Sequence, residues 1–97
     1  MYAIGLIRYR VPLDEVLKVV DEHRAYARQL KAEGTLLASG TMEPRAGGMA
    51  LMRVPDGDVQ GALTRLRDGD PFYAKHIAHY EMFPWVPVIG KEELDKL

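Results

Sequence analysis

The sequence predicts an α+β fold, built from four strands and two helices in a single domain of 97 residues. Two observations support this prediction. Short segments rich in β-forming residues alternate with segments whose apolar residues recur at helical spacing, and glycine or proline stands near most junctions. The length is that of one domain and leaves no room for a second core. We expect a core over about residues 2–86 and a tail over 87–97.

The first part of the chain predicts one strand followed by one long helix. Tyr2–Tyr9 is rich in β-formers and is too short for a helix before Pro12, so we interpret it as the first strand. A helix is predicted from Asp14 to about Glu33, and Gly34 provides its C-terminal stop. Apolar residues form one stripe along this helix: Val16, Val20, Ala27 and Leu30.

Two further apolar segments predict a β-hairpin. Thr35–Met42 and Met49–Val54 give the second and third strands. The residues between them, Glu43–Gly48, read EPRAGG, and their proline and glycine pair mark a turn.

The last part of the chain predicts a second helix and a fourth strand. Residues 56–58 open the helix and Gly69 closes it, while Pro71 starts one further short turn. The stretch from residue 77 to about 83 is the fourth strand, and the terminal KEELDKL is a short polar helix or a frayed tail. The second helix carries an apolar face: Val59, Ala62, Leu63 and Leu66.

The order β-α-β-β-α-β normally gives a four-stranded antiparallel sheet with both helices on one face, the ferredoxin-like arrangement. The first strand has Ile4 and Leu6 at one parity and Ala3 and Ile7 at the other, so both faces of the sheet are apolar. Two helices cover only one face, and monomers rarely expose so large an apolar patch. We therefore expect a homodimer that pairs through the open sheet face.

The composition excludes several classes of function. Thirteen basic and 14 acidic residues give a net charge of -1, which argues against a nucleic-acid or anionic-membrane partner. The absence of cysteine excludes disulfides, thiolate metal sites and cysteine nucleophiles. The N-terminal apolar run is too short for a signal peptide, so we expect a cytoplasmic protein.

Two residues are the best candidates for chemistry. His23 lies on the apolar stripe of the first helix, so its imidazole points toward the sheet and needs a polar partner. Asp70 precedes Pro71, which makes it a suitable N-cap for a short helix. A core histidine and a simple capping aspartate are the alternative interpretations, and spacing alone leaves them open.

Three segments of the chain resemble the YciI-like (YCII-related) family: DEHRAYARQLKAEGTLLASGTM, GGMALMRV and RDGDPFYAKHI. Family members carry a histidine in the first helix, an acidic residue in a D-P-F segment and a small-residue turn on the second strand. Here these are His23, Asp70–Phe72 and Ser39–Thr41, and the resemblance spans about residues 2–86. The family often has a proline where this chain has Thr41.

The resemblance implies a dimeric α+β barrel with a His/Asp pair as its proposed active site. One characterised class of relatives removes chloride from a hydroxylated aromatic ring, and the barrel resembles muconolactone isomerase. We therefore expect a small-molecule lyase or isomerase, in which His23 acts as general base and Asp70 orients the imidazole. The alternative is a non-catalytic module that binds a small molecule or has a regulatory role. An RNA-recognition module shares the element order, but the third strand lacks stacking aromatic residues.

Several other residues are candidates for contacts with a ligand. The strand-two turn would form a wall of the site, and Tyr73 lies close to Asp70 in sequence, whereas other tyrosines are commonly packing residues. Arg8 is either a solvated surface residue or a contact for an anionic substrate. The predicted substrate-binding set is Ser39, Thr41, Phe72, Tyr73 and Arg8.

A metal site is not expected. The series His76, His79 and Glu81 has suitable ligand types, but it straddles a predicted turn-to-strand junction and lacks convergent geometry. We expect no cofactor.

Overall fold

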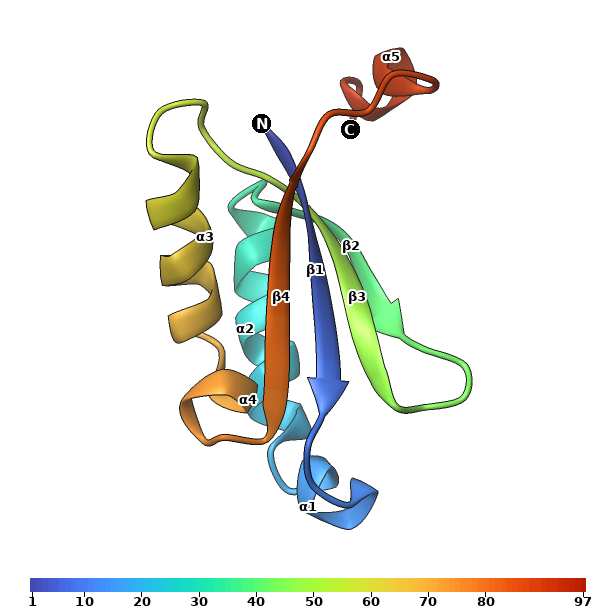
Figure 1. The fold of residues 1–97 in the computed structure, drawn as a ribbon, viewed down its shortest axis with the longest axis vertical. Coiled ribbons are helices and arrows are strands. Elements are labelled where there is room, and N and C mark those ends of the chain that lie inside the picture. The colour runs from blue at the N-terminus through green and yellow to red at the C-terminus, as the bar shows by residue number, and fades with distance from the viewer.

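The structure, a computed structural model, describes residues 1–97 (Figure 1). The strands are β1 (Tyr2–Tyr9), β2 (Leu36–Thr41), β3 (Gly47–Arg53) and β4 (Ala78–Trp85). The helices are α1 (Leu13–Leu17), α2 (Val20–Ala32), α3 (Val59–Asp68), α4 (Pro71–Ala74) and α5 (Lys91–Leu94). None of these helices combines the length and the apolar character that crossing a membrane requires.

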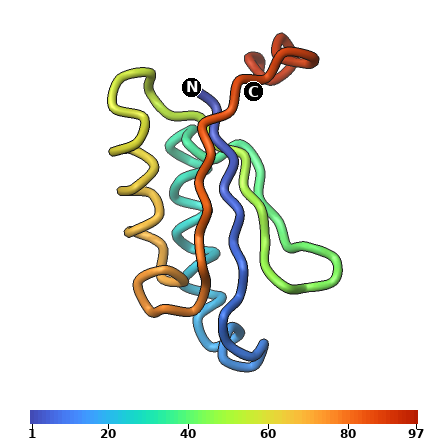
Figure 2. The backbone as a smooth tube through the Cα atoms, in the orientation of Figure 1, coloured from blue at the N-terminus to red at the C-terminus, as the bar shows by residue number.

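The four strands form one antiparallel sheet in the order β2-β3-β1-β4. Helices α2 and α3 cover one face of this sheet, and the path of the chain through the layers can be followed in Figure 2. The predicted α+β class and the ferredoxin-like arrangement are thus confirmed. Pairing into a dimeric barrel stays a prediction, as does the division into a core and a tail.

The predicted first helix is interrupted. The chain forms α1 and α2 in place of one helix from residue 14 to about 33, with Val19 between them at φ -115°. Val19 and Val20 are β-branched and stiff at χ1, which lowers their helix propensity. The break keeps Val16 and Val19 buried, at 0% and 7% exposure.

Strand β3 starts two residues earlier than predicted, at Gly47. The reason is a close approach of two backbones: a Cβ on Gly47 would lie 1.8 Å from the carbonyl oxygen of Ile7. Only glycine permits this pairing, so Gly47, which the sequence assigns to the turn, is instead the first residue of β3.

The interior consists of two separate apolar clusters. One cluster lies between α2, α3 and the sheet and comprises Ala3, Leu30, Leu36, Met52, Val54 and Leu63. The other lies at the end of the sheet near α1 and α4 and comprises Ile7, Val16, Val19, Phe72, Ile77 and Ala78.

The opposite face of the sheet has no helix on it and is largely apolar. Ile4 pairs with Leu51 on one side and Phe83 on the other, so all three side chains share this face. Met49 and Phe83 are 51% and 46% exposed.

Candidate active site

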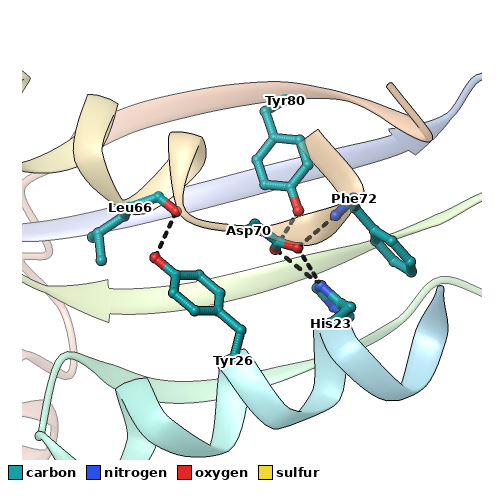
Figure 3. A network of polar contacts seen from close by, with 6 residues as sticks. All are labelled: His23, Tyr26, Leu66, Asp70, Phe72 and Tyr80. Atoms are coloured by element: carbon teal, nitrogen blue, oxygen red, sulfur yellow. Dashed lines mark hydrogen bonds and ion pairs between the residues drawn. The ribbon is translucent and has the colours of Figure 1, made fainter. Parts of the chain in front are cut away.

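The side chains of His23 and Asp70 are in direct contact. His23 lies on α2 and Asp70 precedes α4, and Nδ1 of the imidazole is 2.9 Å from each carboxylate oxygen (Figure 3). The apolar stripe of α2 turns His23 toward the sheet, as the sequence predicts. Asp70 meets it because Pro71 holds the preceding residue extended, at φ -81° and ψ 126°.

Asp70 is a buried carboxylate with several donors around it. Its side chain caps α4 by accepting a hydrogen bond from the backbone N–H of Phe72 at 2.9 Å. The hydroxyl of Tyr80 donates to its other oxygen. The residue is 5% exposed, and these bonds together with His23 compensate its loss of solvation. Capping and contact with His23 are therefore both roles of the same side chain.

The imidazole of His23 is held in one orientation. Its ring stacks on Phe72 with centroids 4.1 Å apart and an interplanar angle of 4°. Because Nδ1 faces a carboxylate, the tautomer of the neutral ring that fits this contact has its proton on Nδ1 and its lone pair on Nε2. Nε2 makes no hydrogen bond within the protein, and it is accessible to solvent and not buried. The basic nitrogen is thus open to a molecule from solvent.

A cavity of about 420 Å³ lies beside this pair, between the sheet and α2. His23 and Asp70 line it, and so do three of the residues predicted to contact a ligand: Ser39, Thr41 and Phe72. The volume is in the range of small-molecule sites.

Two predicted ligand contacts lie elsewhere. Arg8 pairs with Glu81 across 3.6 Å on the helix-free face, because even-numbered residues of β1 point away from the helices. Tyr73 packs edge-to-face on Tyr80 and lies beneath the guanidinium of Arg67. Neither Arg8 nor Tyr73 lines the cavity.

Three tyrosines that sequence reasoning did not select line the cavity: Tyr9, Tyr26 and Tyr80. Burial and the nearby Asp70 carboxylate raise the pKa of Tyr80 far above its ordinary value, so Tyr80 is a neutral donor. Tyr26 donates to the carbonyl oxygen of Leu66 at 2.9 Å, and burial raises its pKa (Figure 3). The signal that could have found Tyr80 is its parity, because it shares the helix-facing side of β4 with Ala78 and Met82.

The other histidines do not gather around the cavity. His76 follows α4 at φ 60°, whereas His79 and Glu81 lie on β4 at the parity of the helix-free face. No group of three or more His, Asp or Glu side chains is close enough to hold a metal ion.

The fold and the site together define a ferredoxin-like α+β protein with a His–Asp pair at a cavity between sheet and helix. The chain belongs to the YCII-related family: the YCII-related domain matches residues 1–86, which confirms the resemblance. A similar solved structure is the 5-chloro-2-hydroxyhydroquinone dehydrochlorinase from Burkholderia phenoliruptrix AC1100, in complex with 2,5-dihydroxybenzoquinone. The two chains are 17% identical with a TM-score of 0.76, over 92% of this chain and 97% of the other. No curated protein matches the sequence.

Proposed function

We propose that this protein is a small-molecule lyase or isomerase in which His23 is the general base. The observation that supports this most directly is the free Nε2 of His23 beside a cavity, with Nδ1 bound to a buried carboxylate. A base in hydrogen-bond reach of a bound ligand, oriented by a carboxylate, is the arrangement that proton abstraction needs.

In the proposed reaction, Nε2 removes a proton from a saturated substrate carbon next to a carbonyl, or from a phenol oxygen. The electron pair of the broken C–H or O–H bond forms a new double bond. In a lyase the leaving group departs with its own bonding pair, and in an isomerase His23 returns the proton to another carbon. Asp70 does not take up the proton; it fixes the tautomer and stabilises the imidazolium that forms.

The similar dehydrochlorinase suggests the first substrate to try, which is 5-chloro-2-hydroxyhydroquinone. Chloride release is measured with the unmodified protein and with His23→Gln and Asp70→Asn. We expect each substitution to reduce the rate by about 10²-fold or more. His76→Asn is the matched control, because His76 is exposed between α4 and β4 and does not line the cavity, and asparagine tolerates its φ of 60°.

Two results would contradict the proposal. One is turnover that survives His23→Gln. The other is saturable binding of the substrate without any conversion, which would favour the alternative of a non-catalytic binding or regulatory module.

We also propose that the protein is a cytoplasmic homodimer that pairs through its helix-free sheet face. The apolar, partly exposed residues of that face support the pairing: Ile4, Met49, Leu51, Phe83 and Trp85.

A further inference from the structure

Arg45, in the loop between β2 and β3, has a guanidinium group without a partner. Its Nε and Nη2 atoms are the only buried side-chain nitrogen or oxygen atoms of the protein that make no hydrogen bond. These two N–H groups lie along one edge of the guanidinium plane, the edge that donates two parallel hydrogen bonds to a carboxylate. Arg45 also lines the cavity beside His23.

The charges around the cavity leave Arg45 unneutralised. Arg24 and Arg28 line it as well, and none of the three arginines forms an ion pair with an acidic side chain. The only acidic residue of the lining is Asp70, whose oxygens already accept hydrogen bonds from His23, Phe72 and Tyr80. A buried charge without a counter-charge is unfavourable, and an anion in the cavity would remove that penalty.

We propose that the cavity binds an organic carboxylate, whose two oxygens accept hydrogen bonds from Nε and Nη2 of Arg45. Of the 24 residues that line the cavity, 14 are hydrophobic, so the carbon skeleton would lie against a largely apolar wall in the cavity that His23 also lines. Arg24 and Arg28 are exposed and attract the anion at the rim. This inference rests on the proposed function and gives its substrate class as an organic carboxylate; 5-chloro-2-hydroxyhydroquinone, which has no carboxylate, tests the chemistry at His23 and not this inference.

The first test compares three probes by isothermal titration calorimetry: benzoate, its neutral isostere benzamide, and inorganic phosphate. Benzoate combines a carboxylate with an apolar body, whereas benzamide lacks the charge and phosphate lacks the body. We expect benzoate to bind at least about tenfold tighter than either of the others, since hydrogen bonds to a charged group contribute roughly 1.5–3 kcal/mol. Equal binding of benzoate and benzamide, or tighter binding of phosphate, would overturn the proposal.

The second test uses variants of Arg45. Arg45→Gln should weaken the binding of benzoate at least about tenfold and leave the binding of benzamide unchanged. Arg45→Lys keeps the charge but loses the two-donor edge, so its affinity for benzoate should lie between those of the unmodified protein and Arg45→Gln. Arg65→Gln is the matched control, because Arg65 is exposed on α3 and does not line the cavity, and this variant should bind benzoate like the unmodified protein. Undiminished benzoate binding by Arg45→Gln would refute the assignment.

Thermal unfolding separates a binding role from a structural one. Because Nε and Nη2 of Arg45 have no protein partner, Arg45→Gln should unfold at a temperature no lower than the unmodified protein. Benzoate should raise the Tm of the unmodified protein and not that of the variant. A large loss of Tm in Arg45→Gln, with no benzoate effect in either protein, would assign Arg45 to the fold.

The inference and the proposed function fail in different ways. Chloride release by a protein that binds benzoate no better than benzamide would remove the carboxylate proposal and leave the catalytic one. Benzoate binding that depends on Arg45, without turnover of any substrate by His23, would do the reverse.

Discussion

At the scale of single residues, the site is organised around Asp70. One buried carboxylate accepts from the imidazole of His23, the backbone of Phe72 and the hydroxyl of Tyr80. The sequence could predict two of these partners, because helical spacing orients His23 and Pro71 makes Asp70 a cap. Parity along β4 could have put Tyr80 on the helix-facing side of the sheet, but its contact with Asp70 and the position of Arg45 could not be predicted, because strand register and loop conformation place them beside residues distant in the chain.

The raised pKa of Tyr80 predicts how the stability of the protein changes at alkaline pH. Burial and the negative charge of Asp70 raise the pKa of Tyr80, so the unfolded chain loses this proton first as the pH rises. The stability that the neutral phenol contributes is therefore complete below its unfolded pKa, near 10.0, and is lost at higher pH.

The ionisation of the tyrosine side chains can be measured by the absorbance of phenolate at 295 nm. In denaturant all tyrosines should titrate together near pH 10. In the native protein, Tyr80→Phe should leave the absorbance change up to about pH 11 unaltered, because Tyr80 does not ionise in that range. A loss of one tyrosine's share of the signal in that variant would contradict the expected burial.

At the scale of elements, the order of the main strands and helices agrees with the prediction, whereas the ends of several elements differ from it. Strand and helix types were predictable because apolar periodicity differs between them. The break between α1 and α2 and the early start of β3 were not, because they depend on backbone packing between distant segments. Gly69 ends α3 as the sequence predicts, and the structure adds a second reason for a glycine there, because the side chain of Tyr26 packs against it.

Gly69→Ala tests that packing. The glycine has φ -79°, which alanine tolerates, but a Cβ there would lie 2.7 Å from the hydroxyl oxygen of Tyr26. We expect the tyrosine to shift, its hydrogen bond to Leu66 to weaken, and the free energy of unfolding to fall by about 1–3 kcal/mol.

Urea unfolding followed by circular dichroism measures the change. Gly57→Ala is the matched control, because a Cβ at Gly57 meets nothing within 4 Å. The control should stay within about 0.5 kcal/mol of the unmodified protein. Equal stability of the two variants would show that Tyr26 does not need the space at Gly69.

At the scale of the whole molecule, the uncovered sheet face is the feature that supports the proposed homodimer. The sequence predicts it from apolar residues at both parities of β1, and the structure leaves Phe83 46% exposed on that face. Such a face is typical of a surface that a second subunit covers.

If the proposed dimer forms, Phe83→Glu should convert it into a monomer. A charge in the middle of an apolar interface has no partner there, whereas in the monomer the same side chain is solvated. Light scattering coupled to size-exclusion chromatography measures the mass of the particle in solution. Circular dichroism shows whether the variant keeps its helices and is folded. Leu17→Glu is the control, because Leu17 on α1 is 49% exposed away from this face. A monomeric unmodified protein at micromolar concentration would refute the pairing.

The division of the interior into two apolar clusters has a consequence for how the protein opens. The cavity touches Leu30 and Met52 of one cluster and Ile7 and Phe72 of the other, so it lies between the two clusters. Amides around α3 and amides around α1 and α4 should then exchange with solvent deuterons through two separate opening events of different free energy. A bound ligand would touch both clusters and merge these events into one, so occupancy of the site would set how many cooperative units the chain has.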